Sequence, residues 1–251
     1  MITTVLALVA GAVVGLALGG LGGGGSVLAV PALIYLLGFS PSAATTASLL
    51  IVTATTATAL YGHAREGAVA WRTGALFALA GIAPAFAAGT LADHLPQPAL
   101  TCAFSAIAAL AAVRMLRPAP GTPRRTRTHP GAAAGAGAGL GAVTGLLGVG
   151  GGFLAVPALT GVLRLPMRRA IGTSLLVITV NSLTALTART GTADALDWAV
   201  VAPFTGAAIL GARDGKRLAA RLSGPLLRRV FAYVLLVVAA FMLVDAVALR
   251  A

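Results

Sequence analysis

One glycine-rich sequence occurs twice in this chain. Residues 22–33 have the sequence GGGGSVLAVPAL and residues 148–159 have GVGGGFLAVPAL, which are identical at nine of twelve positions at an offset of 126 residues. The match continues downstream, where Ser48 corresponds to Ser174. A similarity that recurs at one long period predicts two copies of a single structural unit. Any fold for this chain therefore has to use a glycine-broken apolar segment twice.

The composition places both copies in a membrane. Hydrophobic residues make up 58% of the chain and charged residues 10%, whereas a soluble domain has about 45–50% and about 25%. Apolar stretches of about 20 residues, enough to span a bilayer as a helix, are separated by short charged loops. A soluble helical protein would need polar faces that these stretches lack. We therefore expect an all-α, polytopic membrane protein whose surroundings are the lipid bilayer. The excess of arginine over lysine and the abundant alanine are typical of a GC-rich bacterial genome, so the expected location is the bacterial inner (plasma) membrane.

The first segment of each copy is predicted to be broken. Residues 2–37 are apolar throughout, and as one helix they would be about 50 Å long, too long for a single crossing of a hydrocarbon core about 30 Å thick. Four consecutive glycines at 22–25 are poorly tolerated in a helix, so the break is expected there. Ser26 then begins a shorter helix to about Leu37, with Pro31 in its early turns. The equivalent segment, 131–163, is expected to break in the same way.

The remaining apolar stretches predict six unbroken spans, at 43–62, 73–91, 97–114, 170–188, 198–212 and 226–247. Together with the two broken segments they give about eight transmembrane segments. The expected organisation is a first membrane repeat at 1–116, a cytoplasmic linker rich in proline and arginine at 117–130, and a second membrane repeat at 131–251.

The basic residues predict how the segments are oriented. Four loops contain 16 of the 18 arginines and lysines, namely 63–72, 114–127, 164–169 and 213–229. Placing these loops in the cytoplasm satisfies the positive-inside rule. Both ends of 131–163 are then cytoplasmic and both ends of 2–37 are outside, so each broken segment is a hairpin folded at its glycines. Each copy has an odd number of net crossings, and the second copy is inverted relative to the first. The net charge of +12 is explained by this loop distribution and does not indicate nucleic-acid binding, because the basic residues form no single face.

Inverted repeats with broken helices are a transporter architecture, in which the substrate binds near the midplane where the broken segments meet. Non-helical backbone at that depth is tolerated when it is buried in protein or lines a cavity. The alternative is that the glycines serve close helix packing, as expected for the four-residue spacing of Gly11, Gly15 and Gly19. That spacing does not explain four glycines in a row, so the breaks are the predicted substrate site.

The chemistry available at the breaks suits a small anion. The free N–H groups and positive dipole end of each short helix attract anions, and the span that follows carries hydroxyls and an amide. Many of these hydroxyls have the alternative of bonding to their own helix, but Ser48 and Ser174 are predicted to face the pathway. No carboxylate is available there for a cation. The candidate substrate-binding residues are Gly22, Gly24, Gly25, Ser26, Pro31, Ser48, Gly148, Gly150, Gly151, Gly152, Pro157, Ser174 and Asn181.

Enzymatic activity is not expected. The segment interiors carry no metal-ligand cluster, no Ser-His-Asp set and no paired carboxylates, and a formal G-x-G-x-x-G match at residues 20–25 has no βαβ context. We therefore predict no catalytic residue, no metal and no cofactor. A membrane scaffold or assembly protein without transport activity is the remaining alternative to a transporter. His63, at a predicted membrane edge, is either a candidate for proton coupling or an ordinary loop residue.

Two copies of the pattern G-x-G-G-G-x-x-x-x-P-x-L, each opening one half of a 251-residue chain, resemble the TauE/SafE family of membrane transporters. The resemblance extends over residues 5–247, although Ser26 replaces the last glycine of the first copy. It implies a secondary transporter that works by alternating access on sulfite, a sulfonate or a related organosulfur anion. It also implies coupling to an ion gradient, with a proton or Na⁺ as the coupling ion.

Overall fold

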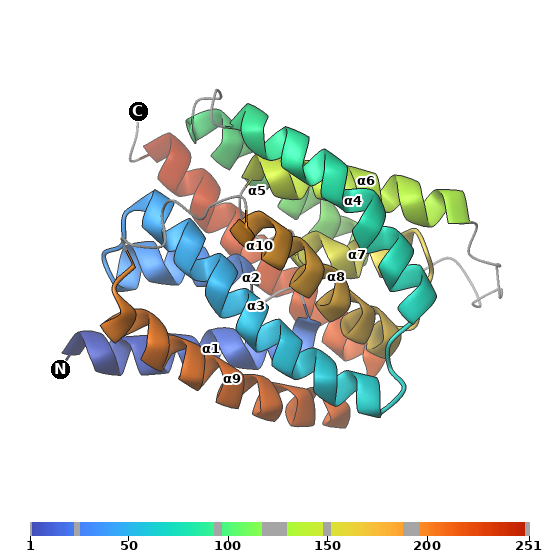
Figure 1. Ribbon diagram of the computed structural model, residues 1–251, viewed down its shortest axis with the longest axis horizontal. Coiled ribbons are helices and arrows are strands. Elements are labelled where there is room, and N and C mark those ends of the chain that lie inside the picture. The colour runs from blue at the N-terminus through green and yellow to red at the C-terminus, as the bar shows by residue number, and fades with distance from the viewer. Residues whose placement is uncertain are drawn as a thin grey trace.

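The structure is a computed structural model that describes residues 2–22, 26–92, 97–116, 130–147, 152–187 and 196–248. Every regular element in these ranges is a helix, which confirms the all-α prediction. In chain order the helices are α1 (Ile2–Leu21), α2 (Ser26–Pro31), η2 (Ala32–Leu36), α3 (Pro41–Arg65), α4 (Trp71–Ala92), α5 (Gln97–Leu116), α6 (Pro130–Leu147), α7 (Gly152–Gly161), α8 (Met167–Thr187), α9 (Trp198–Arg221) and α10 (Gly224–Ala248) (Figure 1).

Long apolar helices confirm a multi-pass membrane protein. Within the described ranges, four helical stretches are long and apolar enough to cross a bilayer, namely Ile2–Leu21, Ala43–Arg65, Trp71–Ala88 and Met167–Leu186. Large apolar side chains such as Val9, Leu79 and Val237 point outward and are more than half exposed, as expected for a surface that contacts lipid. The total of eight segments stays a prediction.

The first half departs from helix at the start of its glycine-rich sequence. Helix α1 ends at Leu21 and α2 begins at Ser26, while in the second half α6 ends at Leu147 and α7 begins at Gly152. Residues 23–25 and 148–151 lie outside the described residues, so the predicted break in the second half stays a prediction. Gly22, the described glycine of the first break, has a φ of +69°, a left-handed conformation that glycine adopts without steric cost.

The short helices after the breaks differ from the prediction in one detail. The α-helix of the first half stops at Pro31 and continues as a five-residue π-helix, η2. The wider hydrogen-bond ladder follows directly after Pro31, whose ring removes one N–H donor.

Both short segments nevertheless end in the same turn. The N–H of Phe39 donates to the Leu33 carbonyl at 3.0 Å, and the N–H of Leu165 donates to the Leu159 carbonyl at 3.0 Å. The residue before each donor, Gly38 or Arg164, is left-handed. Equivalent sequence positions therefore adopt equivalent local structure.

The first segment folds back on itself. The end of α1 lies beside the end of α3, since Gly20 and His63 line the same cavity. In Figure 1 the start of α3 lies on the same side of the molecule as the N-terminus, so α1 and α3 run in the same direction. This arrangement agrees with the hairpin that the arginine distribution predicts, and the inverted topology stays a prediction.

The two halves are paired reciprocally. Helix α1 packs along α9, and α4 packs along α6; the two pairs form opposite edges of the molecule in Figure 1. Gly15 lies directly against the Ala208 carbonyl, and its sequence counterpart Gly141 lies directly against the Gly81 carbonyl. Small residues allow such close backbone approach within membranes. Each half thus supplies a glycine face to the other.

Counterpart helices α3 and α8 cross antiparallel to one another. The hydroxyls of Thr56 and Thr179 are hydrogen-bonded at 2.9 Å, and Gly172 near the start of α8 lies beside His63 near the end of α3. The counterpart pairs α2 and α7, and α5 and α10, also contact each other. Equivalent helices that run in opposite directions are the arrangement expected of inverted units.

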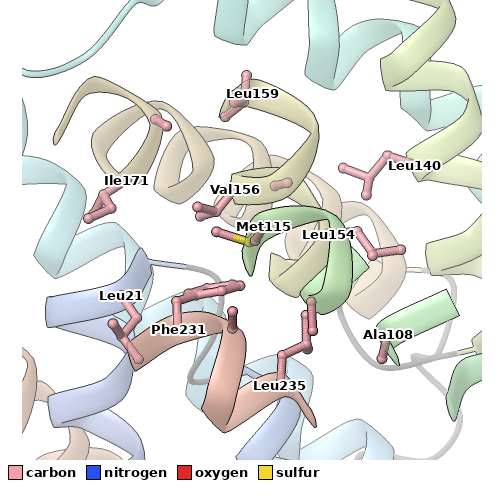
Figure 2. Packing of buried hydrophobic residues seen from close by; sticks show 14 of the residues in the cluster. Leu21, Ala108, Met115, Leu140, Leu154, Val156, Leu159, Ile171, Phe231 and Leu235 are labelled. Atoms are coloured by element: carbon pink, nitrogen blue, oxygen red, sulfur yellow. The ribbon is translucent and has the colours of Figure 1, made fainter. Parts of the chain in front are cut away.

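The apolar core encloses the short helices. Figure 2 shows Leu154 and Val156 of α7 gathered with Met115 of α5 and with Phe231 and Leu235 of α10. A second cluster surrounds α2 and η2 with residues of α1, α3 and α9. The described residues of both short helices are therefore packed against other helices of the protein.

Helix α9 is longer than predicted. It continues past the expected end at residue 212 to Arg221, and α10 begins at Gly224, so most of the predicted loop 213–229 is helical. The reason is a tertiary contact: Gly215 continues the small-residue face of α9 and lies directly against the Leu16 carbonyl of α1. The basic residues of this stretch occupy the other faces of the helix.

Candidate functional site

The first glycine break touches the second half at Ser174. A Cβ atom added to Gly22 would lie 2.7 Å from the Ser174 hydroxyl oxygen and 3.3 Å from the Ile171 Cα. Ser174 is fully buried, and its hydroxyl donates to the Ile171 carbonyl at 2.8 Å. Two of the predicted site residues, from opposite halves, are therefore in contact.

Ser48 lies elsewhere. It is also buried, with 4% of its surface exposed, but α3 and α8 are antiparallel. Ser48 precedes Thr56 on α3 and Ser174 precedes Thr179 on α8, so the two serines lie on opposite sides of the crossing, about 20 Å apart along the helix axes at 1.5 Å per residue. The structure does not bring them to one point.

The other predicted residues are distributed around the two breaks. Ser26 is fully buried at the start of α2, Pro31 and Pro157 are partly buried, and Asn181 is buried on α8 beside Gly81. Gly152 begins α7. Five further predicted residues lie outside the described part of the chain, namely Gly24, Gly25, Gly148, Gly150 and Gly151.

Many hydroxyls on α3 and α8 bond to their own helix, which was the alternative to a role in the pathway. Thr53 donates to the Leu49 carbonyl at 2.7 Å, and Thr184 donates to the Val180 carbonyl at 2.9 Å. Three buried side-chain oxygen atoms have no hydrogen-bond partner within the described residues: Thr55 Oγ1, Asn181 Oδ1 and Ser182 Oγ. Oxygen atoms that could bind a polar ligand therefore remain along the middle of both α3 and α8.

A large basic cavity opens at the end of the bundle where α1 and α3 end and α8 begins. Its volume is about 810 Å³. Among the described residues that line it, six are basic and one, Glu66, is acidic. The basic residues are Arg65, Arg168, Arg169, Arg213, Lys216 and Arg217. The cavity therefore has the charge to attract an anion.

The turn after α3 shapes one wall of the cavity. Helix α3 ends in a Schellman motif, in which the Ala68 N–H donates to the His63 carbonyl at 3.1 Å and Gly67 has a φ of +65°. Gly172 of α8 leaves room for this turn, because a Cβ there would lie 2.6 Å from the Ala68 oxygen. The Ala70 N–H donates to the Thr173 hydroxyl at 3.0 Å. These contacts fix Glu66 at the cavity wall.

Two polar contacts connect three of the four predicted cytoplasmic segments. Lys216 Nζ is 2.7 Å from Glu66 Oε1, which joins 213–229 to 63–72. Arg168 Nη2 donates to the Ala220 carbonyl at 2.8 Å, which joins 164–169 to 213–229. All three basic segments therefore lie at one end of the molecule, as the topology prediction requires.

His63 is a buried cavity residue. It lies in the last turns of α3 with 9% of its surface exposed, and it lines the cavity. The interpretation of His63 as an ordinary loop residue is wrong, because its imidazole is packed inside and bonded to Gly19. Its Nε2 atom has no hydrogen-bond partner within the described chain. Sequence reasoning overlooked Lys216 altogether, since its position was taken as a cytoplasmic loop.

The cavity reaches the first glycine break. Ile171 lines the cavity and also contacts Gly22, and Gly20 is a further lining residue. Ile171 is therefore the residue shared by the cavity wall and the surroundings of Gly22.

A helical multi-pass protein with a broken segment in each half, and a charged cavity that ends at one break, has the construction of a membrane transporter. The chain belongs to the family described as Sulfite exporter TauE/SafE, which it matches over residues 7–242. The resemblance predicted from the glycine motif is therefore confirmed.

Two relatives from Xylella fastidiosa are similar over nearly their full length. The protein of strain 9a5c is 36% identical over 242 residues, covering 93% of this chain and 92% of the relative. The protein of strain Temecula1 is 35% identical over 241 residues, with the same coverage. Both are described as a probable membrane transporter protein. No solved structure matches the chain.

Proposed function

We propose that this protein is a secondary transporter that moves a small anion, namely sulfite, a sulfonate or a related sulfur oxyanion, by alternating access. The observation that carries the proposal is the basic cavity, whose lining of six cations and one carboxylate ends at the Gly22–Ser174 contact. The family supplies membrane transport as the class of activity. The basic lining of the cavity supports a negatively charged substrate.

The proposed mechanism uses two inverted halves, residues 1–116 and 131–251, joined by the cytoplasmic linker 117–130. Support comes from the reciprocal α1–α9 and α4–α6 pairs and from the antiparallel α3–α8 crossing. In this arrangement the cavity of the structure is the cytoplasmic opening. To open the opposite end, the short helix α7 of the second half would have to take the position relative to the bundle that α2 of the first half has now, and α2 the position of α7.

The proposed substrate path runs from the basic cavity past Gly22 and Ser174 to the contacting short helices α2 and α7, and leaves along Ser48 and the second break. The helix N-termini at Ser26 and Gly152 attract the anion. Each dipole end acts like about half a positive charge, so two together offset about one negative charge. A monoanion is therefore the favoured species, and a dianion would need a proton or Na⁺ carried with it. The proposal includes that the protein moves the anion across the membrane without changing it chemically.

Flux measurements in proteoliposomes test the proposal. Wild-type protein should carry sulfite and exclude choline, because the path is lined with cations. Gly24→Leu and Gly150→Leu should abolish sulfite flux in protein that still purifies as a single species, since the side chain fills the path. Gly139→Leu is the control, because a Cβ at Gly139 meets nothing within 4 Å.

Two results would contradict the proposal. Absence of flux for every sulfur anion in well-folded wild-type protein would favour the alternative, a membrane scaffold without transport. Equal flux of sulfite and choline would show that the basic cavity does not select the substrate.

A further inference from the structure

His63 has an unused hydrogen-bonding atom beside the basic cavity. The side chain is 9% exposed, lines the cavity, and keeps Nε2 buried with no partner within the described residues. Most buried polar atoms have a partner, and an exception requires an explanation. The explanation here depends on which of the two ring nitrogens carries the proton.

The contact of His63 with the main chain of Gly19 indicates which ring nitrogen carries the proton. The imidazole interacts with the main chain of Gly19, and since Nε2 is the buried atom without a partner, we assign the proton to Nδ1. A neutral imidazole that carries its proton on Nδ1 presents a lone pair at Nε2. Nε2 is therefore an acceptor, and its natural partner is a group that brings a proton of its own.

Lys216 lines the same cavity as His63. A Cβ added to Gly62, the residue before His63, would lie 3.0 Å from Lys216 Nζ. Lys216 is also the only lysine among the 18 basic residues of the chain. A lysine is a point charge with freely rotating donors on a flexible stem, unlike the rigid fork of arginine. Lys216 is thus suited to exchange one partner for another.

Its present partner is easily replaced. Glu66 Oε1 is 2.7 Å from Lys216 Nζ, but the Glu66 side chain is 62% exposed and that of Lys216 is 21% exposed. An ion pair with one partner so exposed contributes little stability. His63, Glu66 and Lys216 all line the cavity, so an anion that enters it meets both the imidazole and the ion pair.

We propose that His63 Nε2 and Lys216 Nζ form a binding subsite for a small oxyanion that still carries one acidic proton. The O–H group of the anion donates to Nε2, its other oxygens accept from Lys216, and the anion replaces the Glu66 carboxylate on the ammonium group. The subsite rests on the proposed function for its occupant, the hydrogen form of a sulfur oxyanion. A fully deprotonated anion would face the lone pair of Nε2 with a lone pair of its own, so it lacks this hydrogen bond and binds less tightly.

Two probes of equal charge test the subsite. Hydrogen sulfite and methanesulfonate are both monoanions, but methanesulfonate has no acidic proton. Calorimetric binding to the full-length protein in lipid nanodiscs, at one mildly acidic pH where sulfite is present mainly in its hydrogen form, should show hydrogen sulfite bound about ten-fold more tightly, the value of one good hydrogen bond to a charged group.

The variants separate the two roles. His63→Ala should bring the ratio of the two dissociation constants to about one, and this ratio does not depend on the fraction of folded protein. Lys216→Gln should weaken both probes about ten-fold and keep the ratio, because it removes the shared charge contact. Glu66→Gln should tighten both by up to about five-fold, since the competing carboxylate is gone. Arg72→Gln, an exposed neighbour outside the cavity lining, is the charge-matched control and should leave both unchanged.

Equal affinity for the two probes in the wild type overturns the subsite, as does a preference that survives in His63→Ala or weaker binding in Glu66→Gln. Flux without the preference rejects the subsite and leaves the proposed function intact. The preference without flux rejects the proposed function and leaves the subsite intact.

Discussion

Replacing Gly22 by alanine tests whether the first glycine break is held by the contact with the second half. Gly22 has a φ of +69°, and the added Cβ would lie 2.7 Å from Ser174 Oγ and 3.3 Å from the Ile171 Cα. Gly38 provides a matched control, because its φ is +71° and a Cβ there meets nothing within 4 Å. The two substitutions share the backbone conformation and differ in the contact alone.

The expected magnitudes follow from this difference. A left-handed conformation costs an L-residue about 1–2 kcal/mol, so Gly38→Ala should destabilise the protein by that amount. At Gly22 the new methyl group also meets a buried hydroxyl and a main-chain atom, and overpacking of this kind costs about 1–3 kcal/mol more. Gly22→Ala should therefore lower the free energy of unfolding by about 2–5 kcal/mol.

Equilibrium unfolding in mixed micelles measures both variants. In the double variant Gly22→Ala, Ser174→Ala the hydroxyl is removed, and part of the extra loss should be recovered as a coupling between contacting residues. If Gly22→Ala and Gly38→Ala destabilise equally, or if the double variant shows no coupling, the contact between the break and α8 does not stabilise the fold.

Two further predictions concern orientation and packing. A cysteine at Thr126, in a background without Cys102, should react with membrane-permeant thiol reagents alone, whereas a cysteine at Thr192 should also react with impermeant ones. Labelling of position 126 from outside intact cells would contradict the proposed orientation. Gly15→Leu should prevent recovery of monodisperse protein, because the leucine side chain would overlap the Ala208 carbonyl. Gly206→Leu is the control and should purify normally, because a Cβ there meets nothing within 4 Å. Equal recovery of the two variants in size-exclusion chromatography would argue against tight α1–α9 packing.

The helix breaks could be predicted from the sequence because four consecutive glycines have no stable helical alternative. The end of α9 could not. A run of charged residues after Ala212 is typical of a loop, and the helix continues because Gly215 lies against Leu16 of a helix that is distant in sequence. The π-helix after Pro31 is likewise invisible to a pattern of apolar residues, since its side chains suit either helix type.

The relative position of the two candidate serines could not be predicted from their sequence equivalence. Ser48 and Ser174 were expected to face one substrate, but α3 and α8 cross near Thr56 and Thr179, and the serines lie on opposite sides of that crossing. The role of His63 depends on the Gly19 carbonyl, a contact between distant residues that no local pattern records.

The reciprocal pairing of α1 with α9 and of α4 with α6 also determines how the protein is made. The ribosome delivers α1 and α4 to the membrane before α9 and α6 exist, so the glycine faces of the early helices first meet lipid. Small residues leave their backbone poorly covered there, and this surface is buried once the later helices insert. The α4–α6 pair can form once α6 has inserted, whereas the α1–α9 pair must wait until α9 has been synthesised. A gene divided between α5 and α6 should yield stable protein when both pieces are synthesised in the same cell, and unstable fragments when either is made alone.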